Sequence, residues 1–187
     1  MSPRSLPALG LLAALAAPSS ALAAPYEVDT GHSAVLFGAT HFGAGVTFGR
    51  FNEFSGSYDA DGDTLKDFSL TIKAESVDSN LKKRDDHLRS PDFFNVAEFP
   101  VITFKSTKVA KADKGWSVTG DLMLHGVTKS ITIPVEKVGE GDDPWGGYRY
   151  GFISDFKVKR SEFGITEMPG GIGDDIRMIV SIEGKKK

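Results

Sequence analysis

The 187-residue sequence contains no cysteine. This absence excludes disulfide bridges, thiolate catalysis and cysteine-ligated zinc or iron–sulfur sites. Neither sign of charge dominates, because 25 acidic and 22 basic side chains leave a formal net charge of −3. That balance argues against a nucleic-acid partner, since nucleic-acid-binding proteins present a basic surface. We therefore expect a core held together by side-chain packing alone, and no nucleic-acid partner.

The sequence also lacks the motifs of metal and catalytic sites. Its four histidines are His32, His41, His87 and His125. Their spacing is not that of metal ligands, so we expect satisfied polar or turn histidines, with a site assembled across strands as the alternative. The acidic run Asp59–Asp63 does not predict a calcium loop, because Leu70 stands where the loop needs its final glutamate. There is no G-x-S-x-G element either. We predict no metal ligand and no catalytic residue, and hence not an enzyme.

The first residues have the layout of a secretory signal peptide. Arg4 precedes an apolar run over residues 6–17, and the small-residue pattern Ala21-Leu22-Ala23 follows. The apolar run is too short to span a bilayer, which favours cleavage over membrane anchoring. We predict a signal peptide over residues 1–23, cleaved after Ala23, and a single domain over residues 24–187. The mature protein is expected to be secreted, and periplasmic in a cell with an outer membrane.

Hydrophobic and polar residues alternate along most of the remaining chain. Phe68, Leu70 and Ile72 share one face of a predicted strand, and the segment around Val35 and Phe37 alternates in the same way. A period of two is typical of half-buried β-strands. Further strands are expected at residues 48–58, 101–106, 116–124, 130–135, 148–158 and 176–182. About eight short strands, joined by turns rich in Gly and Asp, indicate an all-β antiparallel barrel or sandwich.

Residues 79–99 break this alternation with a charged and aromatic segment. Ser79 or Asn80 can cap a first helical turn, and Ser90-Pro91 can start a second one. We predict two short helices that lie across one end of the barrel. The polar cluster Arg84–His87 within the segment either contacts a ligand head group or forms an Arg–Asp pair that ties the insertion to the barrel rim. The segment Arg160–Gly164 has the same two interpretations.

The aromatic content raises a question that composition leaves open. Thirteen phenylalanines are more aromatic bulk than the rims of an eight-stranded barrel need. A closed barrel of about eight strands either fills its interior with side chains or encloses one ligand. A packed core and a tunnel for an apolar ligand share this composition. Trp145, in a Pro-Trp-Gly-Gly loop, is likewise either an exposed aromatic or a plug.

An ordered set of motifs runs from Tyr26 to about Glu183. The blocks are Tyr26-x-Val-Asp-x-x-His32-Ser33-x-Val-x-Phe37, Arg84-Asp85-x-His87-Leu88-Arg89-Ser90, Asp92-Phe93-Phe94-x-Val96, Phe99-Pro100-x-Ile102-Thr103-Phe104, Leu124-His125-Gly126-Val127-Thr128-Lys129 and Arg160-Ser161-x-Phe163-Gly164. In this order they resemble the YceI-like family. Any one block would be a weak signal, whereas the ordered set is specific.

The resemblance implies a lipocalin-like antiparallel β-barrel of about eight strands, with a short helical insertion near residues 79–99. It also implies an exported protein that binds a long-chain apolar lipid inside the barrel, as a carrier or storage protein. The ligand would be a polyisoprenoid, an isoprenoid quinone or a similar chain, and no other cofactor is expected. The alternatives are a ligand-free, stress-related structural barrel and a lipid-modifying enzyme with Arg84, Asp85 and His87 at its mouth.

Alternation and resemblance together predict the residues that contact the ligand. They are Val35, Phe37, Ala39, His41, Phe51, Leu70, Ile72, Arg84, His87, Phe94, Leu122, Phe152 and Met178. A one-residue error in register would turn a whole strand away from the interior. We expect His41 to be a satisfied core histidine rather than a partner of the head group. Transient contact with a membrane and a homodimer joined at open barrel ends are both compatible with the sequence.

Overall fold

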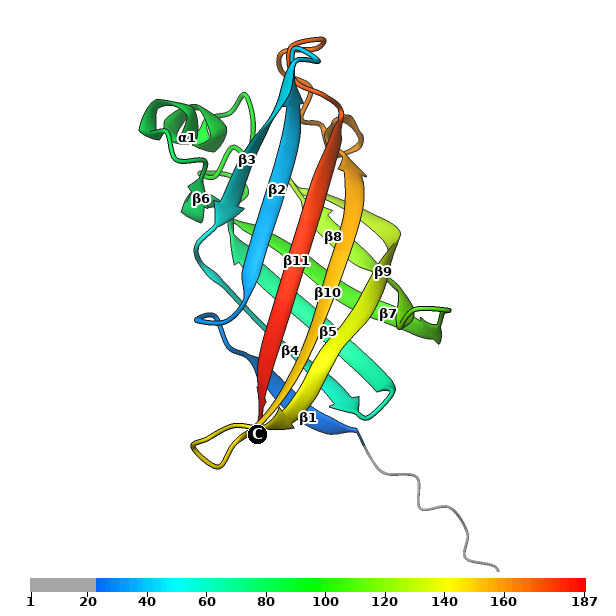
Figure 1. Cartoon of the computed structure of the whole chain (residues 1–187). Coiled ribbons are helices and arrows are strands. Elements are labelled where there is room, and N and C mark those ends of the chain that lie inside the picture. Colours follow the sequence, from blue (N-terminus) through cyan, green and yellow to red (C-terminus); the bar gives the residue numbers. More distant parts are fainter. Residues whose placement is uncertain (1–22) are drawn as a thin grey trace, which may run out of the picture.

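The computed structural model describes residues 23–187, so the predicted signal peptide lies outside the described residues. Eleven strands form one antiparallel sheet (Figure 1). The strands are β1 (Ala24–Val28), β2 (Ala34–His41), β3 (Gly45–Phe51), β4 (Phe54–Asp61), β5 (Thr64–Lys73), β6 (Val77–Asp78), β7 (Val101–Lys111), β8 (Trp116–Leu124), β9 (Val127–Asp142), β10 (Tyr148–Lys159) and β11 (Asp175–Lys186). Within residues 23–187, no helix has the length and apolar character needed to cross a membrane.

The sheet closes on itself through its first and last strands. β1 pairs with β4 on one side and with the end of β11 on the other, and this pairing closes a ring of eight strands. The earlier half of β11 pairs instead with β2, and β2, β3 and β6 continue the wall beyond β1. The predicted antiparallel β-barrel is therefore confirmed, with three additional strands that lengthen it at one end.

One predicted strand proves to be two. The segment 48–58 divides at Asn52 and Glu53, whose backbone groups bond outside the β3 and β4 ladders. The Asn52 N–H donates to the Ser76 carbonyl, and the Glu53 carbonyl accepts from the Lys73 N–H. The chain thereby changes neighbours, because β3 pairs with β2 whereas β4 pairs with β1 and β5. Period-two alternation continues across such a switch and does not reveal it.

The insertion contains one helix rather than the two predicted. Helix α1 spans Lys82–Arg89, and residues 90–99 form turns. Asn95 adopts a φ of 45°, which a continuing right-handed helix does not allow. The predicted cap is also wrong, because Leu81 occupies the N-cap position without a side-chain bond. Ser79 instead donates its backbone N–H to the Asp85 carboxylate at 2.8 Å, which fixes the helix to the segment before it.

Aromatic side chains fill the end of the barrel at which β1 meets β11. Tyr26 and Tyr58 stack with their ring centroids 5.3 Å apart, and Tyr150 packs against both. The Tyr150 hydroxyl donates to the Gly62 carbonyl at 2.9 Å. The Tyr58 hydroxyl donates to the Tyr150 carbonyl, which satisfies a polar group that would otherwise be costly to bury. Burial raises the pKa of both the Tyr58 and the Tyr150 phenols. This end of the barrel is packed shut.

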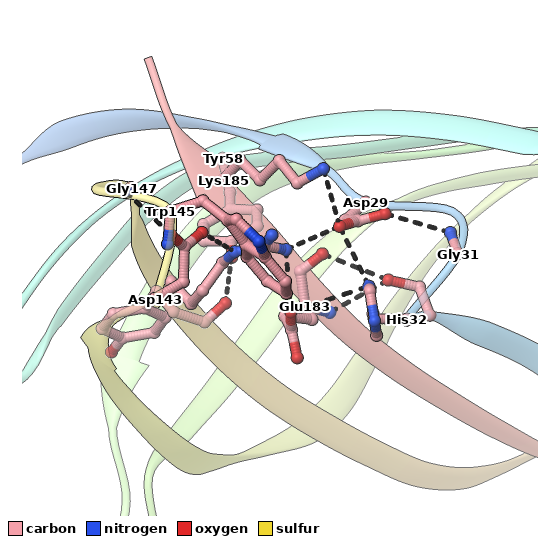
Figure 2. Close-up of polar contacts among 12 residues, drawn as sticks. Asp29, Gly31, His32, Tyr58, Asp143, Trp145, Gly147, Glu183 and Lys185 are labelled. Atoms are coloured by element: carbon pink, nitrogen blue, oxygen red, sulfur yellow. Dashed lines mark hydrogen bonds and ion pairs between the residues drawn. The ribbon is translucent and has the colours of Figure 1, made fainter.

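A charged cluster on the rim reinforces the closed end (Figure 2). Arg149 donates to Asp29 at 2.6 Å, to Asp143 at 2.8 Å and to Glu183 at 2.9 Å, and Lys185 lies 3.0 Å from the same Asp29 carboxylate. The cluster joins the loop after β1, the β9–β10 turn and β11. The hydrogen bond from Arg149 holds the pKa of Asp29 well below its ordinary value, against the opposing effect of burial.

Trp145 occupies the β9–β10 turn beside this cluster (Figure 2). Its side chain is 82% exposed. The sequence left open whether Trp145 is a plug or an exposed aromatic, and the structure shows that it is exposed.

Replacing Asp29 with asparagine should lower the free energy of unfolding at pH 7 by about 1.5–3 kcal/mol, the range for hydrogen bonds to charged groups. Because folding depresses the pKa of Asp29, its stabilising effect is present above the unfolded pKa of about 3.9 and is lost as the pH falls through the lower folded value. The difference between wild type and Asp29→Asn should therefore narrow below about pH 4. Urea unfolding at pH 7 and at pH 3 measures both effects.

Asp155→Asn is the matched control. Asp155 pairs with Arg177, but both side chains are about half exposed, at 48% and 49%. Solvent screens such a pair, so its loss should lower stability less than the loss of Asp29. Equal effects of the two substitutions, or an Asp29→Asn difference that does not change with pH, would contradict the role assigned to the cluster.

Candidate functional site

The interior of the barrel holds a cavity of about 860 Å³ beyond the closed end. Ligand-binding cavities have volumes of roughly 300–1,000 Å³, so this one is large enough for a ligand. Its floor is formed by Phe68, Phe104 and Phe152, with Phe152 5.2 Å from Phe68 and 5.0 Å from Tyr58 between ring centroids. The tyrosines of the closed end do not line it. The barrel therefore has a filled half and a hollow half.

Alternation along the strands builds the walls of the cavity. Val35 and Phe37 point inward from β2, whereas Gly38 faces outward beneath Val46 and Phe48 of β3. Gly49 permits the inward packing of Phe37, because a Cβ at that position would lie 2.3 Å from the Phe37 ring. Apolar β-branched and aromatic side chains from β5, β7, β9, β10 and β11 complete the wall.

Every residue predicted to contact the ligand lines this cavity. They are Val35, Phe37, Ala39, His41, Phe51, Leu70, Ile72, Arg84, His87, Phe94, Leu122, Phe152 and Met178. The structure thus brings them together around one space, while their role toward a ligand stays a prediction. Other residues that line the cavity were not predicted from the sequence, notably Met168 and Ile172 in the long connection after β10. That connection has no alternating pattern from which to assign an inward face.

His41 is not the buried core histidine that the sequence predicted. It is the last residue of β2, where the strand has passed the end of the ring, and its side chain is exposed. Its ring packs edge-on against Phe42, with centroids 4.6 Å apart. An isolated bridge to Ile172 joins it to the connection between β10 and β11. His41 therefore lies at the mouth of the cavity, together with the half-exposed Leu81.

The sequence left open an Arg–Asp pair that ties the insertion to the rim. Among the described residues Arg84 forms no ion pair with an aspartate, because Arg84 and Asp85 both bind Ser79. The Arg84 Nε donates to the Ser79 hydroxyl at 2.7 Å, and the Asp85 carboxylate accepts from the Ser79 N–H. The tie between insertion and rim comes from Arg89, which sequence reasoning passed over. It donates to the carbonyls of Glu75 and Val77, each at 2.7 Å.

Arg160 fixes the other side of the mouth. Its side chain is buried, at 7% exposure, and also lines the cavity. The guanidinium donates to the carbonyls of Ile165 at 3.0 Å, Ile172 at 3.1 Å and Gly173 at 3.2 Å. These bonds hold the connection between β10 and β11 against the end of the barrel. Of the two interpretations of residues 160–164, bracing of the fold is thus observed directly.

Among the described residues, no serine side chain that lines the cavity bonds to a histidine ring. The Ser79 hydroxyl donates to Asp85, and the Ser154 hydroxyl donates to the Pro134 carbonyl. His87 bonds to Asp92 at 2.9 Å and packs edge-on against Phe93. Ser79, Ser154 and His87 thus bond to protein groups around a largely apolar space.

One group of potential metal-ligand atoms occurs in the described residues, far from the cavity. Asp29, His32 and Glu183 place their ligand atoms within 4.8 Å of one another. The Arg149 guanidinium already contacts both carboxylates, and Lys185 contacts Asp29. Two side-chain cations therefore already neutralise the carboxylates that a metal ion would need.

Comparison with known proteins agrees with this architecture. A family model for the YceI-like domain matches residues 26–184. A UPF0312 protein of Shewanella denitrificans is 42% identical over 181 residues, which cover 94% of each chain. The crystal structure of Burkholderia cenocepacia BcnA superposes with a TM-score of 0.76 at 24% identity, over 83% of this chain and 98% of that one.

A second solved structure is a polyisoprenoid binding domain from Saccharophagus degradans, implicated in plant cell wall breakdown. It superposes with a TM-score of 0.65 at 18% identity, over 87% of this chain and 98% of that one. At this identity, both solved structures show a shared fold. Because the family model and the Shewanella relative each span nearly the whole chain, this protein belongs to the YceI-like family.

Proposed function

We propose that the protein binds the hydrocarbon chain of a long lipid, of the polyisoprenoid or isoprenoid-quinone class, inside the barrel. The observation that carries the proposal is the apolar cavity of about 860 Å³ above an aromatic floor. Protein interiors are normally close-packed, with few voids larger than a water molecule. A hollow of this size argues against the alternative of a ligand-free barrel with a filled core. The YceI-like family and the fold shared with a polyisoprenoid binding domain support the same function.

The energetics of a lipid chain in water explain why such a cavity is useful. Each methylene group moved from water into an apolar site stabilises the complex by about 0.8 kcal/mol. A long chain therefore cannot cross an aqueous compartment unaided. With the secretory layout of its first residues, the protein would serve as an exported, periplasmic carrier or store for such a lipid.

The residues at the cavity mouth give less support to the alternative of a lipid-modifying enzyme. It requires Arg84, Asp85 and His87 to act together on a bound lipid. Asp85 is buried and accepts two hydrogen bonds from Ser79, whereas His87 bonds to Asp92 outside the cavity lining. Arg84 and Asp85 therefore share Ser79 as their partner, whereas His87 is engaged with Asp92.

Filling the cavity should weaken binding of geranylgeraniol, a polyisoprenoid alcohol. Met178 lines the cavity, and Met178→Trp adds bulk there, so we expect affinity to fall at least about tenfold, or about 1.4 kcal/mol. Ile179, the next residue of β11, does not line the cavity, and Ile179→Trp should bind as the wild type does. Titration followed by native mass spectrometry measures both. If the Met178→Trp variant binds geranylgeraniol with the affinity of the wild type, the lipid binds outside this cavity.

The mouth carries an apolar surface suited to exchange of lipid with a membrane. Phe42, Val46 and Phe48 of the β2–β3 hairpin are 64%, 52% and 56% exposed. Phe42 adjoins His41 at the mouth, and Figure 1 shows the hairpin at the end opposite the C-terminus. Exposed apolar groups of this kind mark interaction sites. We propose that the hairpin contacts the bilayer transiently while the lipid enters.

Replacing Phe42 and Phe48 together by serine should slow transfer of geranylgeraniol from phosphatidylcholine vesicles several-fold, without changing its affinity at equilibrium. Trp145→Ser is the control, because Trp145 is 82% exposed in the β9–β10 turn, which lies at the opposite end of the barrel in Figure 1. A stopped-flow assay measures the rate of geranylgeraniol transfer from the vesicles to each variant. An equal effect of both would contradict loading through the hairpin. Loss of self-association in the Phe42/Phe48 variant would instead show that the hairpin joins a homodimer.

A further inference from the structure

The barrel wall is split between strands β9 and β10. Their antiparallel register ends at the pair Glu136 and Ile153. Beyond this pair, in the described part of the chain, residues 127–135 of β9 pair only with β8, and residues 154–159 of β10 pair only with β11. Figure 1 shows the two strands separating toward the end of the barrel opposite the C-terminus. We call the gap between residues 127–135 and residues 154–159 the lateral slot.

Pro134 gives the physical reason for the split. The Ser154 hydroxyl donates to the Pro134 carbonyl, so this carbonyl faces β10. The N–H and C=O of a strand residue point toward the same neighbouring strand, so the Pro134 nitrogen faces β10 as well. Proline has no N–H to donate, and it is therefore found at strand edges or bulges. The ladder between β9 and β10 thus lacks a donor here, and the Ser154 hydroxyl satisfies the carbonyl that the ladder leaves free.

The lateral slot opens onto the apolar cavity. Ile131 and Ile133 line the cavity from the β9 side of the slot, and Phe156 and Val158 line it from the β10 side. Ile131 and Phe156 point inward, yet both are only partly buried. An inward side chain stays partly exposed where the wall beside it is open. The slot thus forms an apolar path from the outside of the barrel to the cavity.

Side-chain contacts close the lateral slot at the mouth. The Lys129 ammonium lies 3.1 Å from the Glu162 carboxylate, and the His125 Nδ1 lies 3.1 Å from the Phe163 carbonyl oxygen. We call these two contacts the latch. They join the turn between β8 and β9 to the short 3-10 helix Arg160–Phe163, which follows β10. Lys129 and Glu162 are 39% and 49% exposed, and exposed ion pairs contribute little to stability. The latch can therefore open without unfolding the barrel.

The latch leaves one polar atom of its histidine unsatisfied. Because the Phe163 carbonyl can only accept, the Nδ1 of His125 carries the proton and Nε2 is the acceptor of the ring. This Nε2 is buried and has no hydrogen-bond partner among residues 23–187, and Phe99 packs edge-on against the ring. A buried acceptor without a partner is costly, and opening the latch would expose Nε2 to water. The closed latch is therefore held weakly.

We propose that the lipid chain enters and leaves the barrel sideways through the lateral slot, and that the latch controls its passage. The inference rests on the proposed function and adds a route and a gate to it. Through the mouth alone, a long chain would have to thread lengthwise into the cavity. Through the slot, successive parts of the chain can move in together, against the apolar side chains of β9 and β10. Lids and loops of this kind commonly limit the rate at which ligands are released.

The test fastens the latch with a reversible bridge. The protein contains no cysteine, so an introduced pair can be joined specifically. In the double variant Lys129→Cys/Glu162→Cys, a bifunctional methanethiosulfonate reagent bridges the two thiols. The bridge should slow transfer of geranylgeraniol from phosphatidylcholine vesicles at least about tenfold, because a closed gate becomes rate-limiting. Dithiothreitol, which cleaves the bridge, should restore transfer. Before bridging, the variant should take up lipid faster than the wild type, because its ion pair is lost.

Lys159→Cys/Asp175→Cys is the matched control. These two residues also form an ion pair, at 2.9 Å, and they are 53% and 48% exposed. They join β10 to β11, which remain paired with each other up to this position. The same reagent should therefore bridge them without changing the rate of transfer.

Unchanged transfer in the protein with a bridged latch would show that the chain passes lengthwise through the mouth. That result would overturn the inference and leave the proposed function intact. Equal slowing by the two bridges would also overturn it, because the effect would not depend on the slot. Wild-type protein that takes up no geranylgeraniol at equilibrium would contradict the proposed function and the inference together.

Discussion

The aromatic floor of Phe68, Phe104 and Phe152 is the constraint on which the rest of the structure depends. Below it, tyrosine rings and their satisfied hydroxyl groups pack the barrel shut, and the Arg149 cluster fixes the rim. Above it, the same strands diverge around a space that their side chains do not fill. A barrel packed on both sides of the floor would be a structural protein, whereas a barrel hollow on both sides would lose the core that supports its walls.

The charged side chains also differ between the closed end of the barrel and the mouth of the cavity. At the closed end, cations and carboxylates are matched, as Arg149 with Asp29, Asp143 and Glu183 shows. At the mouth, Arg160 bonds only to backbone carbonyls. Charge matching thus stabilises the closed end, whereas the mouth is fixed by bonds from a cation to backbone carbonyls. The apolar β2–β3 hairpin stands beside this second end.

Period-two alternation in the sequence predicted the strands of a barrel or sandwich and their inward faces, because a strand with one buried face must alternate. The resemblance to the YceI-like family selected the barrel. The alternation could not separate β3 from β4, since two residues that change hydrogen-bond partners do not disturb it. It placed His41 on the inward face but not its exposure, because the strand extends beyond the ring. It could not place Met168 and Ile172, which lie in a connection without a period. The sequence also left open an Arg–Asp pair as the tie of the insertion to the rim, and it could not show that Ser79 binds both Arg84 and Asp85.

The central claim is that the hollow half of the barrel holds a long apolar lipid. Native mass spectrometry of the protein, purified without detergent from its own cells, tests this most directly when solvent extraction follows. The account predicts a discrete added mass near one equivalent, with an isoprenoid fragmentation ladder. An unliganded mass that persists after incubation with polyprenyl phosphates, quinones and fatty amides would contradict it.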